Sequence, residues 1–186
     1  MKLVNIYTDG ACPGNQNENN SGGWGCVLEY GEHKKELSGG EINTTNNRME
    51  LTALISALSC LKEKGLMLNV FSDSAYVINC FKGKWYVNWQ KNGWKTSSKS
   101  PVENQALWEQ LLSLMEGQNV SFYLVKGHLN LSWSQEKLQK AYEQFVSHNG
   151  NAFSYDAFLK IVSMNIRCDE LATTGAAAAK SAADVQ

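Results

Sequence analysis

Proline and cysteine are both scarce in this chain of 186 residues. There are two prolines and five cysteines, and the cysteines are scattered, odd in number and never arranged as a CxxC pair. This usage argues against a disulfide framework and against a zinc site, and it is typical of a reducing compartment. We therefore expect a cytoplasmic protein.

Long apolar runs are absent as well. No stretch approaches the roughly 20 apolar residues that a membrane helix needs. Asn5 and Asp9 interrupt the N-terminal segment before it could form the apolar part of an export signal. The sequence thus predicts no association with a membrane.

Charge of one sign is not in excess, since Lys and Arg number 17 and Asp and Glu number 18. With 43% hydrophobic and 19% charged residues, the composition excludes a wholly disordered chain. The length suits one domain with some additional chain. We expect a single domain over residues 1–172, followed by a disordered, Ala-rich tail over residues 173–186.

The balanced total conceals a basic stretch. Residues 82–99 contain five lysines and three tryptophans but no Asp or Glu. Lysines neutralise phosphates while aromatic rings stack on bases or sugars, so this pattern is typical of contact with a nucleic-acid backbone. A solvated surface above three core tryptophans explains the same residues equally well at this point.

Hydrophobic periodicity predicts an α/β domain with a mixed order of elements. Apolar alternation and short apolar runs predict strands at residues 2–8, 24–30, 32–37, 66–72 and 120–125. Spacings of three and four predict helices at residues 45–65, after Ser74, and at residues 101–115, 133–146 and 155–164. A last helix is expected to begin near Asp169.

Carboxylates stand where two of these strands end. Asp9 and Asp73 each follow an apolar strand, and Glu50 lies early on the helix between them. If the two strands are neighbours, both aspartates reach one rim of the sheet, where ligands of α/β proteins bind. A few hard oxygen ligands suit Mg²⁺, and two such ions can act on a phosphodiester. Taken singly, each residue also has an ordinary explanation as a turn, helix-start or solvent-facing residue.

Five short segments carry a resemblance to a known family. In chain order they are DGACPGN at 9–15, TTNNRMEL at 44–51, SDSAYV at 72–77, VKGH at 125–128 and NIRCDELA at 165–172. Together they resemble the bacterial branch of the type 1 ribonuclease H family, over residues 2–128 and again over 165–172. The resemblance implies a five-stranded mixed sheet flanked by helices. It also implies hydrolysis of the RNA strand of RNA–DNA hybrids, which leaves 5′-phosphate and 3′-hydroxyl ends.

The same resemblance implies roles for particular residues. Asp9, Glu50, Asp73 and Asp169 match the family's carboxylates, which bind two Mg²⁺ ions for which Mn²⁺ can substitute. His128 matches a histidine that assists proton transfer or product release. Residues 82–100 are similar to a basic protrusion that lies along the DNA strand. The implied substrate-binding residues are Asn15, Thr45, Asn46, Asn47, Lys84, Trp85, Trp89, Lys91, Lys95 and Asn104.

The chain departs from the family between His128 and Asp169, which are 41 positions apart. The surplus, about residues 129–164, is predicted to form an inserted helical hairpin that covers the site or contacts a protein partner. We otherwise expect a monomer. Two other functions stay open, namely a non-catalytic module that binds hybrids and a DNA-acting enzyme on the same fold.

Overall fold

The computed structural model describes residues 2–14 and 20–184. At its centre is a five-stranded sheet in the order β3-β2-β1-β4-β5. β1, β2 and β3 pair antiparallel, whereas β4 and β5 continue the sheet in parallel with β1. The mixed five-stranded sheet expected from the sequence is thereby confirmed. The strands are β1 (Leu3–Ala11), β2 (Ser21–Tyr30), β3 (His33–Ile42), β4 (Met67–Ser72) and β5 (Asn119–Leu124).

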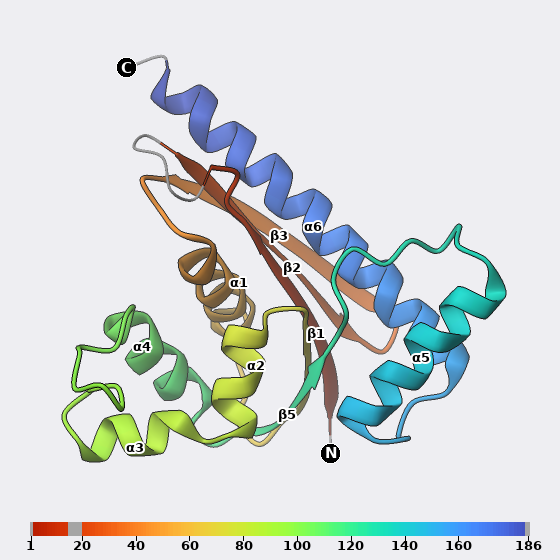
Figure 1. The fold of residues 1–186 in the computed structure, drawn as a ribbon, viewed down its shortest axis with the longest axis horizontal. Coiled ribbons are helices and arrows are strands. Elements are labelled where there is room, and N and C mark those ends of the chain that lie inside the picture. Colours follow the sequence, from red (N-terminus) through yellow and green to blue (C-terminus); the bar gives the residue numbers. More distant parts are fainter. Residues whose placement is uncertain (1, 15–19, 185–186) are drawn as a thin grey trace.

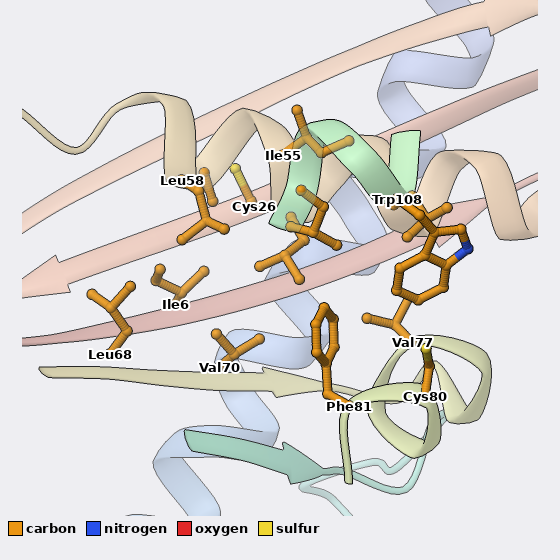
Figure 2. Packing of buried hydrophobic residues seen from close by; sticks show 14 of the residues in the cluster. Ile6, Cys26, Ile55, Leu58, Leu68, Val70, Val77, Cys80, Phe81 and Trp108 are labelled. Atoms are coloured by element: carbon orange, nitrogen blue, oxygen red, sulfur yellow. The ribbon is translucent and has the colours of Figure 1, made fainter. Parts of the chain in front are cut away.

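Helices cover both faces of this sheet (Figure 1). Because successive strand residues point to opposite faces, Ile6 and Val70 pack with α1 and α4, while Tyr7 and Phe71 pack with α5 and α6. Figure 2 shows part of the first cluster, where Trp108 approaches Val77 and Phe81. The helices are α1 (Asn46–Ser59), α2 (Ala75–Lys82), α3 (Trp85–Lys91), α4 (Gln105–Met115), α5 (Gln135–Asn149) and α6 (Tyr155–Ala183).

Two predicted helix boundaries were wrong. The helix expected to close near residue 65 ends at Ser59, because the next amides bond three residues back, from Cys60 to the Ala57 carbonyl and from Leu61 to that of Leu58. The helix expected to open at Pro101 begins at Gln105. Pro101 instead forms an isolated bridge with Lys95.

Strands β2 and β3 extend beyond the predicted strands at residues 24–30 and 32–37, and the added residues include Gly23 and Gly40. A Cβ on Gly23 would lie 1.9 Å from the Ala172 carbonyl oxygen, and one on Gly40 would lie 2.3 Å from that of Gly175. The glycines therefore let α6 approach the sheet at backbone distance, which is one of the roles of glycine in a strand interior. The helix contributes small residues of its own to this contact, namely Ala172, Gly175 and Ala176.

The predicted disordered tail is wrong for the residues that the structure describes. α6 is one continuous helix from Tyr155 to Ala183, without a break near residue 164 and without a separate start near Asp169. Alanine is the strongest helix former, and packing of Ala176 and Gly175 against the glycines of β2 and β3 anchors the segment. Residues 185 and 186 lie outside the described residues.

This close packing makes Gly23 a sensitive position. We expect Gly23→Ala to lower the free energy of unfolding by about 3 kcal/mol or more, because the added methyl meets helix backbone that cannot rotate away. Thermal unfolding followed by circular dichroism measures the change. Gly31→Ala is the control, since its Cβ meets nothing within 4 Å and only the left-handed backbone costs about 1–2 kcal/mol. Equal losses in the two variants would contradict the packing explanation.

The surplus between His128 and Asp169 consists of α5, a short connection and the first turns of α6. Its apolar side packs on this chain's own sheet, where Phe71 stacks on Tyr7 and Tyr123 with centroids 5.1 Å apart in each pair, and Phe153 meets the Phe71 ring edge. Asn149, at the end of α5, accepts from the Leu124 amide and donates to the Leu124 carbonyl. The predicted helical hairpin is thus a second covering layer on the sheet.

Among the described residues, no helix combines the length and the apolar character required to span a membrane.

Candidate active site

Parallel pairing of β1 and β4 brings the first two carboxylates together. The register pairs Thr8 with Ser72, so Asp9 and Asp73 both follow at the same edge of the sheet. This is the carboxyl end of the parallel strands, where α/β proteins place their ligands. The neighbouring strands that the sequence analysis required are therefore present.

Glu50 reaches the same place from α1. The Thr45 hydroxyl caps this helix by accepting from the Arg48 amide at 3.2 Å. β1 then passes so close to the first turns that a Cβ on Gly10 would lie 2.6 Å from the Glu50 nitrogen. Only glycine allows this approach, which delivers the Glu50 carboxylate beside the two aspartates.

Asp9, Glu50 and Asp73 form a tight acidic group. Each offers a carboxylate oxygen, and these oxygens all lie within 4.8 Å of one another. Asp9 and Glu50 are buried, with 6% and 4% of their surface exposed, and Asp73 is half-buried. Within the described part of the chain, this is the one group of its kind that could hold a metal ion.

Burial and mutual repulsion raise the pKa of all three groups. Desolvation is the largest cause that raises the pKa of Asp9 to about 8, and the negative charges of Asp73 and Asp169 raise it further. The Gly10 amide opposes this shift, because it donates a hydrogen bond to Asp9 Oδ1 at 2.8 Å. Desolvation and both aspartates raise the pKa of Glu50 well above its ordinary value. The pKa of Asp73 is also raised by desolvation, while His128 lowers it.

These residues fit a divalent cation. Glu50 Oε2 is buried and has no hydrogen-bond partner among the described residues. A buried carboxylate oxygen without a partner carries a large desolvation cost, which a cation would remove. The donor set consists of hard carboxylate oxygens, as Mg²⁺ and Mn²⁺ prefer.

Asp169 and His128 complete the rim. Asp169 lies on α6 and is exposed, outside the group of three but in the same cleft. His128 is exposed and has a left-handed backbone (φ 57°) after β5. A Cβ on Gly127 would lie 2.6 Å from Asp73 Oδ2, so glycine at this position is what permits the loop to pass beside the carboxylate.

The carboxylates lie in an open cleft of about 600 Å³. Asn46 and Asn47 line it from the start of α1, whereas Thr45 is exposed at the helix cap and Asn15 lies outside the described residues. Sequence reasoning missed Tyr76, which also lines the cleft and whose hydroxyl accepts from Trp108 Nε1 at 2.9 Å. Its position three residues after Asp73, on the first turn of a helix, could have indicated it.

The basic segment forms a second hollow of about 670 Å³ around α3, away from the carboxylates. The hollow is lined by Trp85, Trp89, Lys91 and Lys95. Lys84 and Asn104 have left-handed backbones and directly precede α3 and α4, respectively. The tryptophans divide between the two explanations, exposed aromatic rings for nucleic-acid contact and core packing. Trp85 is 45% exposed, but Trp89 packs on the core, with its ring 5.5 Å from that of Trp108.

A mixed α/β sheet with carboxylates gathered in an open cleft is the architecture of a metal-dependent phosphodiester hydrolase. Residues 1–177 match the family model for RNase H. A Ribonuclease H of Clostridium botulinum is 57% identical over 128 residues, which are 69% of this chain and 85% of the relative. A Ribonuclease H of Syntrophomonas wolfei is 51% identical over 135 residues, 73% of this chain and 90% of the relative.

Solved structures agree. The crystal structure of LC9-RNase H1, a type 1 RNase H with the type 2 active-site motif, superposes with a TM-score of 0.61 at 26% identity, covering 89% of this chain and 85% of that one. The solution structure of the prototype foamy virus RNase H domain gives 0.61 at 20% identity, with 96% of each chain covered, and supports the fold. The chain belongs to the RNase H family, whose members are endonucleases that degrade the RNA strand of RNA–DNA hybrids.

Proposed function

We propose that this chain binds RNA–DNA hybrids and cuts their RNA strand at the cleft formed by Asp9, Glu50, Asp73, His128 and Asp169. The observation that carries the proposal is the group of three carboxylates within 4.8 Å, in which a buried Glu50 oxygen has no partner among the described residues. Such a group is unfavourable on its own and becomes favourable when a cation enters.

Mg²⁺ is the cation that we propose, with two ions per site and Mn²⁺ as a substitute. Asp9, Glu50 and Asp73 would hold it, and the exposed Asp169 would supply a further oxygen across the cleft. Bound divalent cations generate a nucleophile from water at neutral pH and stabilise the charge on the leaving oxygen. A pair of such ions requires more ligand oxygens than four carboxylates offer, so substrate phosphate and water would complete the set.

The chain's own residues orient the reaction. His128 stands at the rim beside Asp73 and is proposed to donate a proton toward the leaving side or to help the product depart. Cleavage of the bond between phosphorus and the 3′-oxygen leaves a 5′-phosphate and a 3′-hydroxyl. Burial of Asp9 and Glu50 keeps their carboxylates fixed while the strand enters and leaves.

Substrate choice would come from two surfaces. Asn46 and Asn47 present amide groups in the cleft, where they can bond base edges and 2′-hydroxyls in the wide minor groove of a hybrid. Asn15 is proposed to act with them, and Thr45 to border a phosphate of the DNA strand. The hollow around α3 offers Lys91 and Lys95 to phosphates and the exposed Trp85 to a sugar or base, with Lys84 and Asn104 close in sequence. LC11-RNase H1, which shares this fold, has been solved in complex with an RNA/DNA hybrid, and this supports the proposal that the chain binds such a hybrid.

Lysines in this hollow should affect binding through phosphate charge. We expect Lys91→Gln together with Lys95→Gln to weaken hybrid binding and to reduce the slope of log K against log salt by about 1 per lysine. Fluorescence anisotropy over a series of KCl concentrations, in the presence of chelator, measures the slope. Lys62→Gln is the control, because Lys62 is exposed and lines neither the hollow around α3 nor the cleft. An unchanged slope in the double variant would remove these lysines from the phosphate contact.

One assay tests the function as a whole. A labelled RNA–DNA hybrid, an RNA duplex and a DNA duplex are offered side by side with Mg²⁺, Mn²⁺ or chelator. We expect cleavage of the hybrid's RNA strand alone, and only with a divalent cation. Binding without cleavage under every condition would favour a non-catalytic module, and equal cleavage of duplex DNA would favour a DNA-acting enzyme.

A further inference from the structure

A second pocket adjoins the carboxylates, and we call it the rear pocket to distinguish it from the cleft described above, the front cleft. It has a volume of about 300 Å³ and shares Asp9, Asp73, His128 and Asp169 with the front cleft. The rest of its wall comes from the segment after His128 and from α6, as Leu129, Asn130, Asn165 and Ile166. The acidic residues thus border both spaces, and the insertion borders the rear pocket but does not line the front cleft.

Asn165 is the unusual residue of this pocket. It is 7% exposed, and its Nδ2 is buried without a hydrogen-bond partner among the described residues. A buried amide without a partner is unfavourable, and an oxygen atom brought into the pocket would satisfy it. Asn165 also precedes Asp169 by four residues on α6, so the two side chains share one face of the helix.

Asn130 supplies a second amide from the insertion. Its Oδ1 accepts from the Ser132 amide at 2.8 Å, and its carbonyl accepts from the Trp133 amide at 3.0 Å, which fixes a tight turn. The turn uses the oxygen of the side chain and leaves the Nδ2 hydrogens outside this hydrogen bond, and Asn130 is an exposed residue that lines the pocket. Two amide donors therefore flank a space whose remaining polar wall is carboxylate and imidazole.

Water is the ligand that this chemistry favours. A phosphate would be repelled by three carboxylates, whereas water can accept from the amides and donate to the carboxylates at the same time. The wall of the pocket carries both amide donors and carboxylate acceptors, and the pocket has room for several water molecules, each of which takes up about 30 Å³ in the liquid.

The place of the pocket also matches the reaction. In-line displacement at phosphorus requires the nucleophile to arrive opposite the leaving oxygen. A nucleic-acid strand lying in the front cleft would obstruct solvent on that side, so the nucleophile must come from elsewhere. The rear pocket is bordered by three of the same carboxylates, those of Asp9, Asp73 and Asp169, and can supply water to them.

We propose that Asn130 and Asn165 are positioning residues that order the attacking water in this rear pocket. The proposal rests on the function proposed above. The water oxygen forms a bond to phosphorus as the bond from phosphorus to the 3′-oxygen breaks. One proton of the water ends on the 3′-oxygen, and the remaining hydroxyl becomes part of the 5′-phosphate.

Competition between nucleophiles tests this role. Hydrolysis of a labelled hybrid is measured in buffer containing methanol, which would attack in place of water and leave a 5′-phosphate methyl ester that mass spectrometry separates. We expect Asn130→Ala to lower kcat about 10-fold with little change in KM, as loss of one oriented hydrogen bond predicts. The ratio of methyl ester to free phosphate should rise severalfold, because the pocket is larger and holds water less well.

Three further variants separate this role from a structural one. Asn130→Asp retains the turn acceptor but has no amide donor, so it should retain the raised ester ratio; a return to the wild-type ratio would overturn the proposal by showing that only the turn matters. Asn165→Ala should raise the ratio as well, and if it does not fold, the Asn130 variants still decide. Asn151→Ala, an exposed change between α5 and α6, should leave kcat and the ratio unchanged.

Failure of the rear-pocket proposal and failure of the proposed function would give different results. An unchanged ester ratio and kcat in both Asn130 variants, with normal hybrid cleavage by the wild type, would overturn the rear-pocket proposal alone. No cleavage of hybrid by the wild-type chain with any cation would instead contradict the proposed function.

Discussion

Replacing Asp9 with asparagine is expected to lower hybrid cleavage at least ~10³-fold, which corresponds to about 4 kcal/mol of activation free energy. Asn is nearly the same size as Asp, so the fold should persist. It removes a charge from the centre of the group of three carboxylates, and stabilisation of the reacting phosphate by a bound cation is worth several kcal/mol. Single-turnover cleavage of a labelled hybrid at saturating Mg²⁺ gives the rate.

The matched control is Asp156→Asn, the same change on the exposed first turn of α6, away from the cleft. We expect it to cleave at the wild-type rate. Hybrid affinity of Asp9→Asn, measured by anisotropy, should stay within a few-fold of the wild type, because the lysines and amides that contact the strands are unchanged. Undiminished turnover in Asp9→Asn would remove this carboxylate from the mechanism.

Without divalent cations, the protein is expected to lose stability as pH rises from about 4 to about 8. The pKa of Asp9 is raised from 3.8 to about 8 in the folded state, so over this interval the folded chain binds a proton that the unfolded chain has released. Stability falls with pH wherever the folded state binds more protons. Glu50 and Asp73, whose pKa values are also raised, act in the same direction. At about 1.4 kcal/mol per pKa unit, the combined loss amounts to several kcal/mol.

Divalent cations should reverse this loss. A cation stabilises the ionised carboxylates and binds only the folded arrangement, so Mg²⁺ or Mn²⁺ should raise the melting temperature at pH 8 far more than at pH 5. Thermal unfolding at several pH values, with chelator and with cation, measures the difference. In Asp9→Asn the pH dependence should be shallower and the cation effect smaller.

Titration of Glu36 does not contribute to the stability change between pH 5 and pH 8. Arg167 and Lys34 lower the pKa of Glu36 to about 2, so its contribution is present above pH 4.5 and is lost only at more acidic pH. If metal-free stability were flat between pH 5 and pH 8, the three carboxylates would not be in repulsive contact, and the candidate metal site would be contradicted.

Local sequence patterns predicted most of the fold. The apolar alternation in β1 and the short apolar run of β4 are local signals of a strand. The helix cap at Thr45 is also local, because its hydroxyl accepts from the amide three residues later in the chain. The placement of Asp73 directly after β4 and of Glu50 on the intervening helix was also readable from spacing, whereas β1 continues two residues past Asp9, which we had expected to follow the strand. The resemblance added Asp169, which lies in a helix and follows no strand, and which spacing alone could not have assigned.

Local patterns failed where long-range contacts decided the outcome. Gly23 and Gly40 lay outside the predicted strands, and residues 173–183 were expected to belong to a disordered tail, because neither segment shows its partner in its own sequence. Each is explained by the other, since the small residues of α6 pack against the glycines of β2 and β3.

The sequence by itself determined the strand and helix types, the acidic positions and the acid-free basic stretch, because these follow from side-chain chemistry and from spacing along the chain. Only the tertiary structure decided that three carboxylates would lie within 4.8 Å with raised pKa values, and that Asn130 and Asn165 would line one pocket together with two of them. Burial and mutual distance are properties of packed elements. They arise from contacts between residues up to 160 positions apart, such as Asp9 and Asp169, which no local pattern contains.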